Sequence, residues 1–171
     1  MTKIVKLAFD TDALIKLIKA EFPKNIFKKI QAVISEEVYN ESVTQGKQRF
    51  YKDAEVIEQI EKEGYIRKVK SKESETANNL LKEAVFGRGE ISTLHLYFNI
   101  KADAIISDDK AFLIFLKRNN IKFIIPADLI YILHKKGLLN KEEALKIIDK
   151  LRMYIDEGFY NNIKTRLEGE K

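Results

Sequence analysis

Short apolar runs alternate along the chain with longer stretches in which apolar residues recur at helical spacing. Residues 4–9, 32–34 and 103–106 are apolar runs of strand length, and residues 65–69 and 122–125 also have strand character. Strands that alternate with helices pair in parallel and are covered on both faces, so this order predicts an α/β fold. We expect a central, mostly parallel sheet between two helical layers.

Helices are predicted between these strands and after the last of them. Pro126 suits the first turn of a helix, Gly137 suits its end, and Asn140 with Glu143 forms a capping pattern for the next helix. We expect the chain to fray beyond about residue 160. The predicted helices cover about residues 12–18, 36–46, 50–63, 74–86, 90–97, 110–117, 126–136 and 140–155.

Length and composition narrow the chemistry to oxygen and imidazole ligands. The chain has 171 residues, which suits a single domain over residues 1–171. It contains no Cys, so disulfides, thiol nucleophiles, zinc ribbons and iron–sulfur clusters are excluded. Because there are only 2 His, carboxylate chemistry is a better expectation than a histidine-based site.

The net charge and the hydropathy pattern indicate which partners and which cellular location to expect. The net charge of +5 favours a polyanionic partner. No apolar run approaches the roughly 18 residues of a membrane span, and the first residues lack the apolar stretch of a secretion signal. We therefore expect a cytoplasmic protein with no membrane partner.

Acidic residues follow the predicted strands at the points where the strands end. Asp10 follows the first strand, residues 36–41 follow the second, and Asp108 and Asp109 follow the strand at 103–106. Glu90 opens a helix after a Gly-Arg-Gly break. Sheets of this kind carry their chemistry at the carboxyl ends of the strands, so the acids are predicted to converge in one cleft.

Each acid could also have a purely local structural role. The predicted convergence of the acids in one cleft favours a shared functional site over these local roles. Asp10 and the pair Asp108 and Asp109 suit N-caps, Glu90 suits the positive end of its helix, and Glu41 suits a solvated helix face. Clustered carboxylates stay ionised together only when a cation neutralises them, and Mg²⁺ or Mn²⁺ prefers oxygen ligands. Such ions bridge phosphate oxygens and activate water, which predicts a phosphate ester as substrate.

Four segments carry a resemblance to a known family. They are Asp10-Thr11-Asp12, the run from Ser35 to Glu41, Gly89-Glu90, and Ser107-Asp108-Asp109-Lys110. Together they resemble the PIN-domain nucleases, especially the prokaryotic VapC-like toxins, over about residues 4–125. The run Lys135-Lys136-Gly137-Leu138-Leu139 is similar to the archaeal and bacterial branch with extra C-terminal helices. The resemblance implies a PIN-like three-layer α/β/α fold, with a nuclease core over about 1–125 and a helical extension over about 126–171.

The same resemblance implies a metal-dependent endoribonuclease. Its catalytic residues would be Asp10, Glu41, Glu90, Asp108 and Asp109. Asp10, Glu90 and either Asp108 or Asp109 would hold one or two Mg²⁺ or Mn²⁺ ions, and Glu41 would bind directly or through water. The Ser-x-Asp pattern points to Asp109, whereas the Asp-Asp-Lys pattern equally allows Asp108.

Other polar residues near these motifs have supporting or local roles. The resemblance implies that Thr11 supports the first acid and Ser107 the last. Arg88 and Lys110 flank the acids, where they could contact phosphate or remain solvated. His95 and His134 are interpreted as packed or surface histidines rather than ligands.

Two departures from the VapC-like pattern stand out. The third acid is Glu90 where Asp is frequent, and the second motif lacks the Pro that often precedes its helix. The first departure would alter the geometry around a metal ion, and the second is minor.

The expected partners are RNA as substrate, an antitoxin protein if the chain is a toxin, and a second copy of the chain. The predicted helices at 50–63 and 140–155 offer faces for a homodimer. One alternative is a catalytically inactive PIN-like module that binds RNA or protein. Another is a haloacid-dehalogenase-like phosphatase with Asp10 and Asp12 as its acids, although the apolar helix that follows directly lacks that family's Gly-containing loop.

Overall fold

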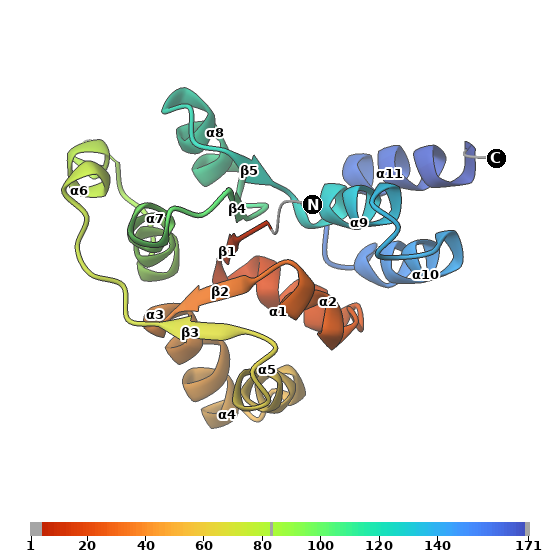
Figure 1. The fold of residues 1–171 in the computed structure, drawn as a ribbon, viewed down its shortest axis with the longest axis horizontal. Coiled ribbons are helices and arrows are strands. Elements are labelled where there is room, and N and C mark those ends of the chain that lie inside the picture. The colour runs from red at the N-terminus through yellow and green to blue at the C-terminus, as the bar shows by residue number, and fades with distance from the viewer. Residues whose placement is uncertain (1–4, 83, 170–171) are drawn as a thin grey trace.

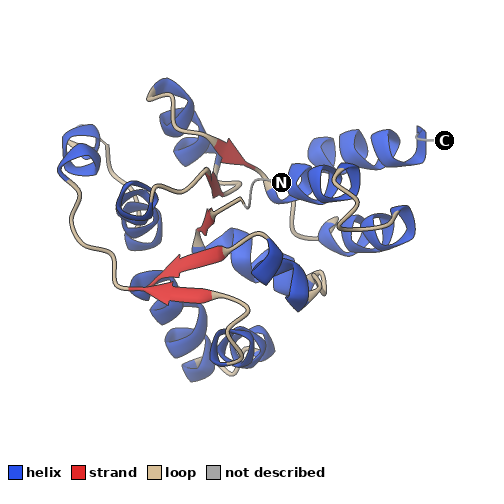
Figure 2. Cartoon of the chain, viewed as in Figure 1, coloured by secondary structure: helices blue, strands red, loops and turns tan. Residues whose placement is uncertain are grey.

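The computed structural model describes residues 5–82 and 84–169, and within them five strands form one sheet. The strand order is β3-β2-β1-β4-β5, and each neighbouring pair is parallel (Figures 1 and 2). This confirms the predicted α/β fold with its central parallel sheet. The strands are β1 (Leu7–Phe9), β2 (Ala32–Ser35), β3 (Arg67–Val69), β4 (Ala104–Ile106) and β5 (Phe123–Ile124).

Helices surround the sheet on both sides (Figure 2). The helices of the first half are α1 (Thr11–Lys19), α2 (Lys24–Lys29), α3 (Glu36–Tyr39), the π-helical turn η1 (Asn40–Thr44), α4 (Gln45–Gln48), α5 (Lys52–Lys62) and α6 (Glu75–Leu81). Those of the second half are α7 (Arg88–Ile100), α8 (Lys110–Arg118), α9 (Pro126–Lys135), α10 (Lys141–Leu151) and α11 (Glu157–Gly169). No described helix has the length and apolarity that crossing a membrane requires.

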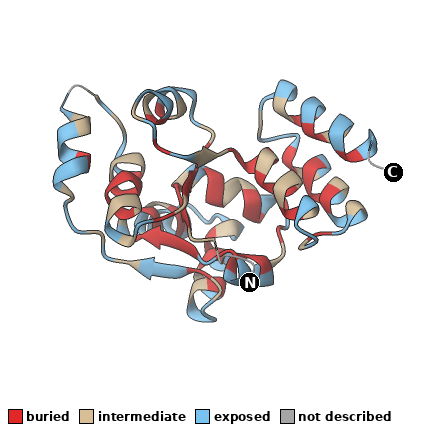
Figure 3. Cartoon of the chain, turned by 45° about the horizontal axis from the view of Figure 1, so that its top comes forward, coloured by how far each residue is buried: buried red, intermediate tan, exposed pale blue. Residues whose placement is uncertain are grey.

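Alternation along the strands divides the core into two layers. Successive residues of a strand point to opposite faces, so the buried strands β1, β2 and β4 contribute to both layers. Residues 7, 9, 34 and 106 join a cluster that includes α1, α2, α5 and α9 to α11, while residues 8, 33 and 105 join one that includes α7 and α8. Buried positions gather in the three inner strands β1, β2 and β4 and on the helix sides that face them (Figure 3). The result is the expected α/β/α arrangement.

Helix starts follow the capping residues of the sequence. Asp10, Ser35 and Asp109 are the N-caps of α1, α3 and α8, and each side chain accepts a hydrogen bond from a backbone N–H of the first turn. Asn140 and Glu143 form the predicted capping box of α10. These caps fix where the chain turns from each strand edge into the following helix.

The C-terminal region is more ordered than the sequence pattern predicts. The expectation that residues beyond about 160 fray is wrong, because α11 runs to Gly169 and buries Tyr160, Ile163 and Leu167. Their spacing of three and four residues puts them on one face, which packs into the same cluster as the sheet. The helix expected over 140–155 ends at Leu151, and a turn separates it from α11. Helices α9, α10 and α11 lie together at one side of the molecule (Figure 1).

Candidate active site

Asp10 is a buried carboxylate at the carboxyl end of the central strand β1. Its backbone N–H donates to the carbonyl of Ile106, which continues the pairing with β4 for one residue beyond β1. Oδ1 accepts a hydrogen bond of 2.8 Å from the backbone N–H of Ala13, so the side chain caps α1. The residue is only 4% exposed. The predicted cap role is therefore confirmed, but this burial is far greater than a surface cap requires.

Burial raises the pKa of the Asp10 carboxyl from 3.8 to about 7. Hydrogen bonds from the Ser107 hydroxyl and the Ala13 N–H partly offset this effect, and the neighbouring Asp108 and Asp12 add to it. No cationic side chain among the described residues contributes to the shift. Asp10 is thus a carboxylate whose charge is supported by two hydrogen bonds and opposed by its surroundings, a setting that a bound cation would reverse.

Asp108 and Asp109 follow β4 but have different local roles. The Asp109 carboxylate accepts from the backbone N–H of Phe112 at 2.7 Å and caps α8. The Asp108 carboxylate is bound by Lys16 of α1, whose Nζ lies 2.9 Å from Oδ1 and 2.7 Å from Oδ2. Of the two residues, Asp108 is the one whose charge raises the pKa of Asp10.

Glu41 reaches the same region from the π-helical turn η1. The Thr11 hydroxyl, one residue after Asp10, donates to Glu41 Oε2 at 2.5 Å. Gly89 leaves room for this contact, because a Cβ built on it would lie 2.6 Å from Glu41 Oε2 and 2.8 Å from Thr11 Oγ1. The elements α1, η1 and α7 therefore approach one another closely at Thr11, the residue after Asp10.

Glu90 lies in the first turn of α7, beside Gly89, but is directed elsewhere. A Cβ at Gly87, the N-cap of α7, would lie 2.6 Å from Glu90 Oε2, so the side chain folds back over the start of its own helix. None of its described contacts joins it to Asp10, Glu41 or Asp108. The structure therefore links Asp10 to Asp108 electrostatically and ties Glu41 to Thr11, the residue after Asp10, while Asp109 and Glu90 lie at the starts of their helices.

Small polar residues hold the elements around these acids. The hydroxyls of Ser35 and Ser92 lie 2.7 Å apart and join α3 to α7. The Thr93 hydroxyl donates to the carbonyl of Gly89 at 2.7 Å. All three are buried. Ser92, Thr93 and Lys16 were not predicted from the sequence; the signal available for the first two was a pair of hydroxyl residues that only Ile91 separates from Gly89-Glu90.

The two histidines have structural contacts. His95 is 8% exposed, and its Nδ1 accepts the backbone N–H of Ser74 at 2.9 Å, which ties α7 to the start of α6. His134 lies 3.1 Å through Nδ1 from the carbonyl of Leu139. Both observations agree with the interpretation of these residues as packed histidines.

The donor chemistry fits a divalent cation in an open site rather than a closed cage. Within the described residues, no three acidic or histidine side chains are placed so that they alone could hold a metal ion. Mg²⁺, however, usually retains several waters and is bound through one or two carboxylates together with substrate phosphates. Asp10 and Asp108, at the carboxyl ends of the neighbouring strands β1 and β4, supply two such carboxylates.

A parallel α/β sheet with buried carboxylates at its carboxyl edge defines a class of domain that suits phosphate chemistry. The chain belongs to the PIN-domain family: residues 6–169 match a family model described as a PIN domain. The match includes the helical extension, and PIN domains are in general nucleases. Comparisons with curated proteins and with solved structures gave no match.

Proposed function

We propose that this protein is a metal-dependent endoribonuclease. The observation that carries the proposal is the buried Asp10 carboxylate, which sits beside Asp108 at the carboxyl edge of a PIN-family sheet. A carboxylate that is costly to ionise and has an acidic neighbour is a frequent sign of a functional site. The family match favours this function over a haloacid-dehalogenase-like phosphatase.

Asp10 and Asp108 would hold Mg²⁺ or Mn²⁺, and Glu41 would bind it directly or through water. A bound ion would neutralise phosphate charge and activate a water molecule for attack on phosphorus. Glu90 and Asp109 remain proposed members of the catalytic set. Asp109 would act while capping α8, and Glu90 would need to turn away from Gly87.

The remaining side chains position the acids. The Ser107 hydroxyl and the Ala13 N–H hold the Asp10 carboxylate in one orientation. Thr11 fixes Glu41, and Gly89 allows that contact by having no side chain. These groups support a site whose acids are arranged before substrate arrives, which is how positioned charges contribute to catalysis.

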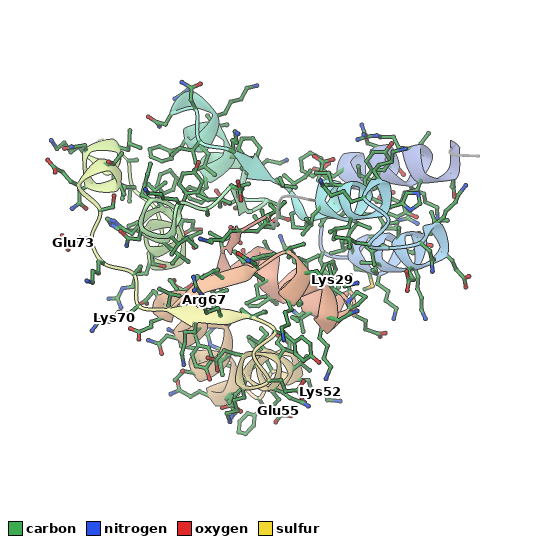
Figure 4. All side chains as sticks on the ribbon, viewed as in Figure 1. Lys29, Lys52, Glu55, Arg67, Lys70 and Glu73 are labelled. Atoms are coloured by element: carbon green, nitrogen blue, oxygen red, sulfur yellow. The ribbon has the colours of Figure 1, made fainter. Side chains whose placement is uncertain are left out.

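A hollow of about 440 Å³ next to α7 supports an RNA substrate. The cationic residues that line it are Lys70, Lys72 and Arg88. Lys70 and Lys72 lie on the segment between β3 and α6, on which Figure 4 labels Lys70 and Glu73. Arg88 and Ser92 of α7, which flank Gly89 and Glu90 in the chain, line the hollow. Acids at residues 36, 37 and 73 also line it, which favours a few specific phosphate contacts over a broad basic surface.

Cleavage of RNA in the presence and absence of metal tests the proposal. Purified protein is incubated with labelled single-stranded and structured RNAs under Mn²⁺, Mg²⁺ or EDTA, beside Asp10→Asn and the surface variant Asp149→Asn. We expect cleavage that requires metal, falls at least about 100-fold in Asp10→Asn and persists in Asp149→Asn. Equal cleavage by Asp10→Asn, or cleavage in EDTA, would contradict it.

A catalytically inactive binding module is the second candidate, and one observation favours it. The described residues contain no complete three-acid group that could hold a metal ion. Under this alternative the protein binds RNA without cutting any RNA in the presence of Mn²⁺, and binding is insensitive to Asp10→Asn.

The toxin assignment, with an antitoxin as partner, extends the proposal through the resemblance to VapC-like proteins. Its test is expression in a host cell. Growth arrest that Asp10→Asn abolishes would support a toxin, whereas normal growth with active nuclease would indicate another nuclease role.

A further inference from the structure

The Lys16 ammonium group contacts both carboxylate oxygens of Asp108, one of the proposed metal-binding acids. Its Nζ lies 2.9 Å from Asp108 Oδ1 and 2.7 Å from Oδ2, and the two residues are 92 positions apart in the chain. The side chain of Asp108 is 8% exposed and that of Lys16 is 25% exposed. Because the Asp108 side chain is almost fully enclosed, solvent screens this ion pair less than it screens an exposed surface pair.

The pair stands beside a second carboxylate that has no such partner. Asp10 caps the start of α1, and Lys16 lies on the same helix, so one helix brings an acid and a cation to the same edge. Asp108 repels the charge of Asp10, whereas no cation within residues 5–82 and 84–169 offsets that repulsion. Lys16 therefore balances one of two neighbouring negative charges.

We infer that Lys16 is a positioning residue that serves as a built-in counter-ion of Asp108 and competes with the divalent ion for that carboxylate. The inference rests on the proposed function. In the metal-free protein Lys16 holds Asp108 next to Asp10 and limits the repulsion between the two acids. A divalent ion that binds Asp108 has to displace the ammonium group, so the strength of this ion pair sets the metal affinity.

This role predicts opposite effects on metal binding and on stability. Removing the ammonium group leaves two carboxylates without a cation, which attract a divalent ion more strongly. It also leaves an enclosed charge unpaired in the metal-free protein, which lowers its stability. A purely structural lysine would lower stability without strengthening metal binding.

Calorimetric titration with Mn²⁺ measures the first effect. Lys16→Met is compared with wild type, with Lys16→Arg, which keeps the charge, and with Lys19→Met, which removes a charge from the same helix outside the ion pair. We expect Lys16→Met to bind Mn²⁺ at least about tenfold more tightly, and the two controls to remain within about twofold of wild type. Unchanged or weaker binding by Lys16→Met would overturn the inference.

A double-mutant cycle locates the effect at Asp108. In an Asp108→Asn background, Lys16 has no carboxylate to compete for, so adding Lys16→Met should strengthen Mn²⁺ binding by less than about twofold. A gain as large as in the wild-type background would show that Lys16 acts through its net charge and would overturn the inference.

Thermal unfolding supplies an independent readout that does not depend on catalysis. Lys16→Met should melt at a lower temperature than wild type in EDTA and gain more from Mn²⁺. If Lys16→Met does not fold without metal, Lys16→Gln takes its place under the same criteria. Failure of the wild type itself to bind Mn²⁺ would remove the proposed function, whereas binding by wild type without a gain in Lys16→Met would remove only this inference.

Discussion

Asp10 at the sheet edge and Asp149 on the C-terminal helices show how two regions of the molecule use the same side chain. Asp149 is half exposed and accepts hydrogen bonds from Tyr160 and Lys164, and the Lys164 ammonium holds its pKa below the ordinary value. Asp10 is buried, no cation in the described part of the chain supports its charge, and its pKa is raised to about 7. Asp149 therefore ionises easily, whereas burial makes ionisation of Asp10 unfavourable. Acids whose ionisation is unfavourable in this way are typical of functional sites.

The largest expected difference between the two regions is the effect of the Asp10 protonation state on the free energy of unfolding. Because the folded protein holds the Asp10 proton more tightly than the unfolded chain, this group favours folding near pH 4, and its contribution is lost as the pH rises toward 7. The shift from 3.8 to about 7 corresponds to roughly 4 kcal/mol. Denaturant unfolding in EDTA across pH 4–8 should show the stability of wild type falling relative to Asp10→Asn. A difference that does not change between pH 4 and 7 would contradict the raised pKa.

The next prediction concerns the structural role of the extension. Leu167 is fully buried in α11, so Leu167→Ala should lower the free energy of unfolding by about 2–4 kcal/mol. Met153 is 84% exposed in the same region, and Met153→Ala should change it by less than about 0.5 kcal/mol. RNA cleavage per folded molecule should be unchanged in both variants. A negligible cost for Leu167→Ala would restore the idea that this end of the chain frays.

Gly89 tests whether the sheet-edge acids act as a group. In Gly89→Ala the new methyl displaces Glu41 from Thr11, because both lie within 3 Å of its position. We expect cleavage to fall about tenfold, while the free energy of unfolding changes by no more than about 1 kcal/mol, since Ala favours the helix. Gly87→Ala is the matched control, because its methyl meets Glu90 instead. Equal loss in both variants would give Glu90 the same weight as Glu41.

The smallest effect is expected at Asp149. Asp149→Asn removes an exposed ion pair and should cost less than about 1 kcal/mol at pH 7. Because the folded-state pKa is lowered, this contribution is present at neutral pH and disappears on acidification below about pH 4, opposite in direction to Asp10. Chemical denaturation at pH 7 and pH 3 measures it, and a larger cost at pH 3 would contradict the comparison.

Much of the fold followed from local signals in the sequence. The apolar runs at 32–34 and 103–106 became β2 and β4, and the caps Asp10 and Asn140 start their helices as predicted. Helix α7 begins at Arg88 rather than Glu90, because Gly89 lies within the helix where α7 approaches Glu41. That approach is a tertiary contact, so the Gly-Arg-Gly pattern alone indicated a break.

The features that the sequence did not predict are a short helix and several side-chain contacts between residues far apart in the chain. Helix α2, a six-residue helix after Pro23, is too short to show a clear apolar period. The direction of Glu90 and the division of roles between Asp108 and Asp109 depend on side-chain geometry that residue type does not encode. Lys16 was missed because its partner lies 92 residues away, and a lysine on an amphipathic helix is usually solvated.

The central claim is that Asp10 is the main ligand of a divalent cation at the sheet edge. Calorimetric titration of Mn²⁺ into wild type, Asp10→Asn and Asp149→Asn tests this claim most directly. We predict that wild type and Asp149→Asn bind Mn²⁺ alike and that Asp10→Asn loses at least about tenfold in affinity. Equal binding by wild type and Asp10→Asn, or no binding by wild type, would contradict the account.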